Sequence, residues 1–290
     1  MTTRSALIEA GAEVLTERGE KAAADPLATM EAIADRLGLR EEPDRPQFWL
    51  FVRRDEWAPT EVLRRFTGAI IPVRTSRGIL HREPSYWLRA RAAGVEVVGM
   101  DWMLEPGRWR EGLASTVAFL ASVGAKAFCL NVEPRPKGYP RRWEGQREEA
   151  SAYAIAARDL CDRHRLELWF SSWAMPRARE SFPWADFIRP AHVCIPQPYE
   201  VHGRAGPGYV AEVLEEWRAL GAREMILGRG AHELDPSDAD HWRTSAEVAE
   251  HRRSTPAGMS EAWWLPSGSI PAAVLEAMVA RDSNGRERAS

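Results

Sequence analysis

The chain has 290 residues, of which 44% are hydrophobic and 28% are charged, and its formal net charge is −3. This composition is typical of a soluble globular protein, and the small net charge gives no reason to expect a nucleic-acid partner. No apolar run approaches the roughly 18 residues that a membrane span needs, and the N-terminus lacks the hydrophobic region of a signal peptide, so we expect no membrane contact and a cytoplasmic location.

The first 45 residues have the apolar spacing of helices. Apolar side chains recur at helical intervals over 6–15 and again over 27–37, and the charged, proline-containing stretch 40–46 has the composition of a linker. We therefore predict a helical segment with a linker at 1–45 and a separate domain at 46–290. The helical segment is suited to self-association or to docking onto a larger assembly.

From Gln47 onward, short apolar runs alternate with helical stretches. Eight runs are predicted to be strands, namely 48–52, 69–73, 95–100, 125–132, 166–172, 192–196, 223–228 and 258–265. Helices are predicted between them at 59–66, 84–94, 108–123, 144–164, 209–220, 237–255 and 271–280. Eight such units indicate an α/β protein with the fold of a (β/α)8 TIM barrel. A doubly wound open sheet is the alternative, but no GxGxxG motif follows the first run.

Polar and aromatic residues follow the predicted strands, and in TIM barrels the chemistry lies at the carboxyl ends of the strands. Carboxylates and tryptophans around one opening suit glycosidic bond cleavage, in which one carboxyl group protonates the leaving oxygen and a second acts as nucleophile or as base for water. Tryptophan rings and amide groups would hold the sugar. The candidates, from first strand to last, are Arg53, Arg74, Asp101, Trp102, Asn131, Glu133, Trp173, Gln197, Tyr199, Glu261 and Trp263.

Three stretches carry a resemblance to a known family. "RARAAGVEVVGMDWM" (89–103), "LNVEP" (130–134) and "EAWWLP" (261–266) resemble the lysozyme-like glycoside hydrolase barrels of family 25. The resemblance implies that Glu133 is the general acid. The family has a D-x-E motif here, and Asn131 stands in place of the aspartate. The family's aspartate on the first strand has no counterpart at 50–53, although Asp55 follows shortly after.

We therefore predict a glycoside hydrolase-like barrel that cleaves or binds a polysaccharide or a peptidoglycan-type glycan. Glu133, Asp101 and Glu261 are the predicted catalytic residues, with Asp101 preferred as the partner of Glu133. Asp55 is a further choice for that partner. The predicted substrate-binding residues are Asn131, Trp102, Trp173, Gln197, Tyr199, Arg53, Arg74 and Trp263. A protein without a signal peptide would reach a cell-wall glycan through lysis or a dedicated export machine.

Other interpretations of the same residues stay open. The replacement of the motif aspartate by Asn131 favours a non-catalytic carbohydrate-binding or structural barrel. The glycines of "LGRGAHE" (227–233), together with Arg53 and Arg74, favour a barrel enzyme with a phosphate substrate. Glu133 could instead pair with an arginine, and Asp101 could be a structural cap. Because Trp263 and Trp264 alternate in direction, at most one of them faces the opening.

Metal and cofactor chemistry is not expected. The three cysteines (Cys129, Cys161 and Cys194) form no CxxC pair, and the histidines have no ligand spacing. We predict reduced, buried thiols, with no metal site and no cofactor.

Overall fold

The computed structural model describes residues 47–52, 60–73, 84–101, 105–134, 143–198, 206–231, 243–264 and 270–280. The segment predicted to be helical at 1–45 lies outside these ranges. The strands of the described part are β1 (Phe48–Phe51), β2 (Gly68–Pro72), β3 (Glu96–Asp101), β4 (Ala127–Asn131), β5 (Glu167–Trp173), β6 (Val193–Gln197), β7 (Glu224–Met225), β8 (Leu227–Gly230) and β9 (Glu261–Trp264).

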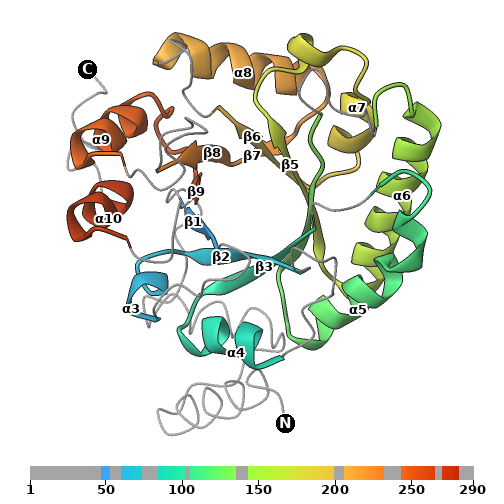
Figure 1. Ribbon diagram of the computed structural model, residues 1–290, viewed down its shortest axis with the longest axis horizontal. Coiled ribbons are helices and arrows are strands. Elements are labelled where there is room, and N and C mark those ends of the chain that lie inside the picture. Colours follow the sequence, from blue (N-terminus) through green and yellow to red (C-terminus); the bar gives the residue numbers. More distant parts are fainter. Residues whose placement is uncertain are drawn as a thin grey trace, which may run out of the picture. The chain divides into compact units, whose positions relative to one another are not determined.

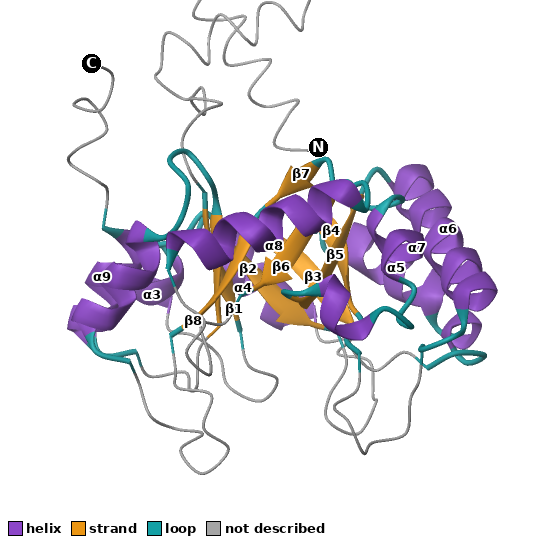
Figure 2. Cartoon of the chain, turned by 90° about the horizontal axis from the view of Figure 1, so that it is seen from above, coloured by secondary structure: helices purple, strands orange, loops and turns teal. Residues whose placement is uncertain are grey.

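Helices connect these strands and form a ring around them (Figure 1). Over the described residues, the α-helices are α3 (Thr60–Leu63), α4 (Pro84–Ala92), α5 (Leu113–Ser122), α6 (Arg147–His164), α7 (Trp184–Ile188), α8 (Pro207–Ala219), α9 (Ser245–Arg253) and α10 (Ala272–Val279). The same residues include two short 3-10 helices, η1 (Trp109–Glu111) and η2 (Pro176–Arg179). Seen at right angles in Figure 2, the helices lie outside the strands, so the layers are those of a β/α barrel.

The strands form one parallel sheet in the order β7-β6-β5-β4-β3-β2-β1-β9-β8. The strand predicted at 223–228 is divided into β7 and β8. β7 pairs with β6, and β8 pairs with β9. Between them, Ile226 donates its backbone N–H to the carbonyl of Cys194 over 2.9 Å. One extended segment therefore joins the two edges of the sheet and closes the barrel. The prediction of eight strand units in a TIM barrel is confirmed.

Side chains alternate along each strand between the barrel interior and the helix layer. Partners across neighbouring strands share a face, as Met100 and Cys129 do inside the barrel. Near the amino ends of the strands, the rings of Trp49 and Trp169 meet edge to face with centroids 4.8 Å apart. Buried side chains therefore fill the barrel interior at this level.

The helices are stabilised by apolar faces and by their ends. Five buried residues of α6 recur at helical spacing and face the sheet: Ala150, Tyr153, Ala154, Ala157 and Cys161. The N-terminus of α9 is a capping box, in which Thr244 and Glu247 exchange side-chain to backbone hydrogen bonds. This cap explains why α9 begins at Ser245 and not near Ser237 as predicted.

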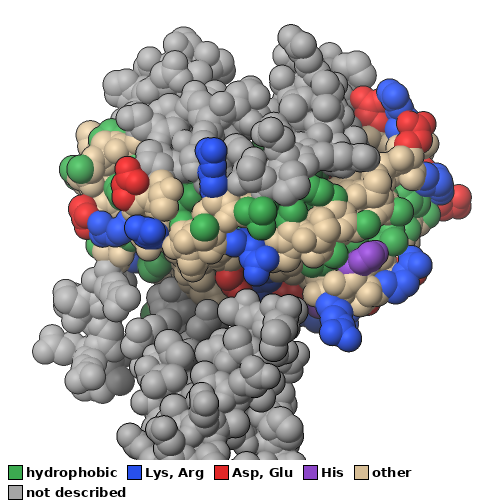
Figure 3. All heavy atoms as spheres, turned by 90° about the horizontal axis from the view of Figure 1, so that it is seen from below, with side chains coloured by type: hydrophobic (Ala, Val, Ile, Leu, Met, Phe, Trp, Pro, Cys, Tyr) green, Lys and Arg blue, Asp and Glu red, His purple; other side chains and the backbone are tan. Residues whose placement is uncertain are grey.

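The three cysteines are free and buried, as predicted. Burial raises the pKa of each thiol, to about 12 for Cys161 and for Cys194. On the face shown in Figure 3, basic and acidic side chains are interspersed over the described surface. Among the helices that the structure describes, none has the length and apolar character needed to cross a bilayer.

Candidate active site

The carboxyl ends of β4, β5 and β6 bring a set of polar side chains into one cluster on the inner wall. Asn131 is the last residue of β4 and pairs in register with Ser171 of β5. Gln197 is the last residue of β6 and pairs with Trp173. Asn131, Ser171 and Gln197 are buried, whereas Glu133 and Trp173 are half-buried. Four residues predicted from the sequence (Asn131, Glu133, Trp173 and Gln197) therefore lie together at the opening of the barrel.

Hydrogen bonds connect the whole cluster. Gln197 Nε2 donates to Asn131 Oδ1 over 3.0 Å and to Ser171 Oγ over 2.7 Å. Asn131 Nδ2 donates to Glu133 Oε1 over 3.2 Å, and Trp173 Nε1 donates to Glu133 Oε2 over 3.3 Å. Each oxygen of the Glu133 carboxyl group thus receives an N–H, one from Asn131 at the end of the same strand and one from Trp173 on neighbouring β5, which fixes the orientation of the group.

The alternation of β4 explains why these polar residues face inward. Ala127 and Cys129 belong to the interior core, whereas Phe128 and Leu130 pack against the helices. Asn131 and Glu133, which are two and four positions after Cys129, continue the inner face. The strand "AFCLN" is therefore apolar inside the barrel and becomes polar on its inner side only where it reaches the opening.

Asp101, the preferred partner of Glu133, lies at the carboxyl end of β3 and is 1% exposed. It pairs in register with Leu130, which packs in the outer core, and it follows Met100, which lies in the interior. The side chain of Asp101 therefore points to the helix layer. The prediction that Asp101 shares the inner wall with Glu133 is corrected.

Glu261 and Trp263 are also placed differently from the prediction. Glu261 is the first residue of β9, so it lies at the amino end of a parallel strand and at the end of the barrel opposite Glu133. Trp263 is 0% exposed and pairs with Leu50 of the outer core. Neither residue faces the opening, and the assignment of Glu261 to catalysis and of Trp263 to substrate binding is corrected.

A buried charge cluster beneath α9 accounts for Glu261. Its carboxylate lies 3.2 Å from Arg252 Nε and 3.7 Å from Arg229 Nε, and it accepts a hydrogen bond from Thr255. Burial raises the pKa of Glu261 above its ordinary value, and the two guanidinium groups and the hydroxyl of Thr255 oppose that effect. These contacts connect β8 and β9 to the end of α9, so the role of Glu261 is structural.

The two glycines at 228 and 230 are strand residues and not part of a loop. Gly228 and Gly230 lie in β8, where they pair with Ala262 and Trp264 of β9. A Cβ on Gly228 would lie 2.9 Å from the carbonyl oxygen of Pro196, so this glycine permits close packing of β8 against β6. Arg229 points outward and donates to the carbonyl of His251 and the hydroxyl of Ser254. The local support for a phosphate enzyme is therefore removed.

Four predicted binding residues lie outside the described residues: Arg53, Arg74, Trp102 and Tyr199. Within the described ranges, no group of three or more His, Cys, Asp or Glu side chains is arranged to hold a metal ion.

Two further residues of the opening were not among the predicted site residues. Ser171 accepts from Gln197 and donates to the carbonyl of Ile195 over 3.4 Å. Trp264, not Trp263, is on the inner face at the carboxyl end of β9, where its ring stacks on Phe51 with centroids 4.3 Å apart. The period of two along a strand could have identified both, given the correct register.

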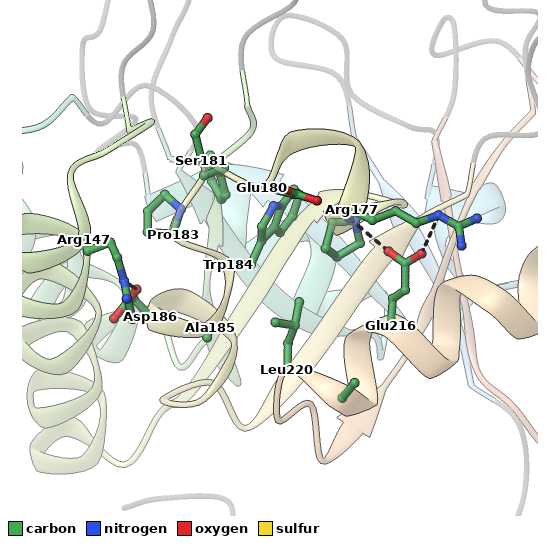
Figure 4. Close-up of a pocket in the computed structure, with 13 residues that line it drawn as sticks. Arg147, Arg177, Glu180, Ser181, Pro183, Trp184, Ala185, Asp186, Glu216 and Leu220 are labelled. Atoms are coloured by element: carbon green, nitrogen blue, oxygen red, sulfur yellow. Dashed lines mark hydrogen bonds and ion pairs between the residues drawn. The ribbon is translucent and has the colours of Figure 1, made fainter.

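A cavity of about 600 Å³ lies on the outside of the barrel, between α6, η2, α7 and α8. Figure 4 shows Arg147 beside Asp186 at one end and Arg177 paired with Glu216 at the other, with N–O distances of 3.2 Å and 2.9 Å. Between the two ion pairs the lining is mostly apolar and includes Trp184 and Leu220. The lining contains no member of the Glu133 cluster, so this cavity is separate from the candidate active site.

Comparison with known proteins shows similarity at the level of the fold. No family model matches the chain, and no curated protein matches it either. A glycoside hydrolase family 18 N-acetylglucosaminidase from Paenibacillus barengoltzii has 9% identity and a TM-score of 0.57, over 81% of this chain and 99% of that one. Catalytic domain 2 of the Ostrinia furnacalis Group II chitinase has 11% identity and a TM-score of 0.55, over 81% and 95%.

A third structure comes from another glycoside hydrolase family. The GH5-4 broad-specificity endoglucanase from Clostridium longisporum has 10% identity and a TM-score of 0.52, over 78% of this chain and 86% of that one. At these identities the similarity establishes a TIM barrel like those of glycoside hydrolases. It does not single out the lysozyme-like family 25 that the sequence resembles.

Proposed function

We propose that the barrel hydrolyses glycosidic bonds in a polysaccharide or peptidoglycan-type glycan, with Glu133 as general acid. The observation that carries this proposal is the double hydrogen bond to Glu133, from Asn131 on one side and Trp173 on the other. A carboxyl group at the carboxyl end of a barrel strand is in the position where TIM-barrel enzymes perform chemistry. Fixed donors hold it in one orientation, as proton transfer to a leaving oxygen requires.

The inner wall favours a mechanism with one carboxyl group from the protein. At the opening, the inner positions of the described strands carry Glu133 as their single carboxyl group, beside Phe51, Met100, Asn131, Trp173, Gln197, Gly230 and Trp264. One carboxyl group is sufficient in substrate-assisted glycosidases, where a group of the substrate replaces the protein nucleophile. A 2-acetamido group can play that part, so we propose a glycan that contains N-acetylglucosamine.

The similar barrels support this choice of substrate. Two of the three act on, or are named for, chitin or N-acetylglucosamine, and a mutant of the Ostrinia furnacalis chitinase domain has been solved with penta-N-acetylchitooctaose. The second candidate is a barrel that binds a glycan without cleaving it. The uncharged Asn131 beside Glu133 is the observation that favours it, because the lysozyme-like motif has a carboxylate there.

The test is glycan cleavage by the wild type and by Glu133→Gln. The substrates are N-acetylglucosamine oligomers, purified peptidoglycan and cello-oligosaccharides, which lack the 2-acetamido group. We expect the wild type to release products from the first two, and the substitution to reduce kcat about 10²- to 10⁴-fold, as is typical for loss of a general acid.

Glu167→Gln is the matched control. Glu167 lies at the amino end of β5 and accepts the indole N–H of Trp169 over 2.7 Å, so the substitution changes the same kind of pair at the other end of the barrel. We expect it to retain wild-type kcat. Cleavage of cello-oligosaccharides alone would overturn the acetamido mechanism. Binding without cleavage would support the second candidate, and absence of both would reject a glycan function.

A further inference from the structure

Gln197 was predicted to contact the substrate, but its surroundings indicate another role. Its side chain is 3% exposed, and its amide nitrogen donates to two buried neighbours, Asn131 and Ser171. A side chain so enclosed has little surface left for a sugar. It joins β6 to β4 across β5, and the residue that it holds on β4 is the one that donates to Glu133.

The hydrogen bonds of this cluster have a fixed direction, which begins at the backbone. The carbonyl of Ile195 can only accept, so the hydroxyl of Ser171 donates to it and presents a lone pair to Gln197. Gln197 must therefore turn its NH2 group toward Ser171. The same NH2 group also donates to Asn131, which must therefore accept through its side-chain oxygen.

The direction set at Ser171 passes through two amides to the carboxyl group. Once Asn131 turns its oxygen to Gln197, its own NH2 group faces Glu133. The opposite orientation would place two NH2 groups against each other and an amide oxygen against a carboxylate. Each of these contacts would leave buried polar groups unsatisfied, which is unfavourable.

We infer that Gln197 is a positioning residue, which sets the orientation of the Asn131 amide and thereby keeps an N–H donor on Glu133. This inference rests on the proposed function for its catalytic consequence, but the orientation itself can be measured without activity. Because the relay consists of a hydroxyl and two amides, it carries no charge of its own. It therefore fixes the carboxyl group without competing with it for a proton.

The kinetic test compares Gln197→Met with the wild type. Methionine has a similar size and no donor, so Asn131 loses its constraint while the packing is kept. We expect kcat on N-acetylglucosamine oligomers to fall about 10- to 100-fold, the effect of a small misplacement of a reacting group. KM should change less than twofold, because Gln197 does not contact the sugar. A rise in KM with unchanged kcat would show that Gln197 binds substrate and would overturn the inference.

The second readout is the indole N–H resonance of Trp173 in the 15N spectrum, assigned by its absence in Trp173→Phe. Since this N–H donates to Glu133, its shift reports the ionisation of that carboxyl group. Gln197→Met should move the titration midpoint to higher pH, because Glu133 loses a donor that favours its charged form. An unchanged midpoint would overturn the inference. If the wild type cleaves no glycan, the proposed function fails and this titration still decides the role of Gln197.

Ser171→Ala and Ser172→Ala form a matched pair on neighbouring residues of β5, and both residues are 0% exposed. Ser171 faces the interior and accepts from Gln197, whereas Ser172 pairs in register with Pro196 and faces the helices. We expect Ser171→Ala to move the midpoint in the same direction as Gln197→Met, and Ser172→Ala to leave it unchanged. The pair also serves if Gln197→Met does not fold. Equal effects of both serine substitutions would reject the relay.

Discussion

Trp173 donates its indole N–H to Glu133 Oε2 over 3.3 Å, from β5 to the residue two positions after the end of β4. The ring of Trp173 lies beneath the guanidinium group of Arg179, with 5.7 Å between the centroid and Cζ. Trp173 was expected to stack on a sugar. Its indole N–H instead donates to Glu133, and Arg179 lies over one face of its ring. The hydrogen bond gives Trp173 a role in orienting Glu133.

Trp173→Phe is expected to lower kcat on the proposed glycan about 10- to 100-fold. Phenylalanine keeps the aromatic packing and removes a hydrogen bond to a charged group, which contributes about 1.5–3 kcal/mol, and each 1.4 kcal/mol corresponds to a tenfold change in rate. The matched control is Trp184→Phe, which removes the indole hydrogen bond to the carbonyl of Arg179 on the same connection. It should reduce thermal stability and leave kcat unchanged. Equal kinetic effects at both positions would indicate a general loss of structure.

Asn131→Asp is expected to extend activity to higher pH. The substitution replaces the N–H donor that lies 3.2 Å from Glu133 with a second carboxyl group. Two carboxyl groups at this distance cannot both ionise readily, so the pair retains one proton to higher pH than Glu133 alone. The descending alkaline limb of the kcat profile should therefore move upward in pH. Asn131→Ala supplies the comparison, since it removes the donor and adds no acid. An identical alkaline limb in the wild type and Asn131→Asp would contradict a proton-donating role for Glu133.

Sequence patterns predicted the barrel because its strands are short apolar runs separated by helical stretches, and each of the eight runs became part of the sheet. The division of 223–228 into β7 and β8 was not foreseen. The run is continuously apolar from Met225 to Leu227, and its break at Ile226 arises from a change of pairing partner from β6 to β9. Which neighbouring strand a segment pairs with depends on the folded barrel, so it leaves no local signal in the sequence.

The placement of the candidate residues was predicted in part, and the errors concern the direction of side chains and the bounds of one strand. The residues Asn131, Glu133 and Gln197 were identified because a strand end is visible in the sequence as a change from apolar to polar. Which side of the strand a residue faces depends on register, and a shift by one residue reverses every side chain. The assignments of Asp101 and Trp263 failed in this way. Glu261 failed because β9 begins at that residue, three positions later than predicted.

Arg229→Met is expected to destabilise the protein by about 3–5 kcal/mol without affecting the chemistry. Arg229 is 0% exposed, and its removal leaves the carboxylate of Glu261 with less compensation for its burial. Urea unfolding would measure the loss. The control is Arg65→Met, which removes an exposed pair with Glu276 and should leave stability nearly unchanged.

The same cluster also provides a test of the corrected assignment of Glu261. Glu261→Gln should retain kcat at 25 °C, where the variant is folded, because Glu261 lies at the end of the barrel opposite Glu133. A loss of kcat comparable to that of Glu133→Gln, in a protein with an intact unfolding transition, would restore Glu261 to the active site.

Glu149 is expected to give the protein a pH-dependent increment of stability. One oxygen of its carboxylate accepts hydrogen bonds from Arg110, from the backbone N–H of Gly107 and from the indole of Trp109, at 2.8 to 2.9 Å. These contacts, led by Arg110, lower the pKa of Glu149 below its ordinary value. The native state therefore binds this proton more weakly than the unfolded chain, so the increment is fully present above about pH 5 and is lost as pH falls through the lowered pKa.

The measurement is urea unfolding of the wild type and Glu149→Gln at pH 7 and at pH 3. The difference between the two proteins isolates Glu149 from the other carboxyl groups, which titrate in both. We expect the wild type to be more stable at pH 7, and the difference to shrink at pH 3, because protonation makes the wild-type side chain as neutral as glutamine. Glu148→Gln, the same change one residue earlier on the exposed side of α6, should leave stability unchanged at both pH values. A wild-type advantage that is as large at pH 3 as at pH 7 would mean that shape, and not the charge of Glu149, holds α6 to the segment before α5.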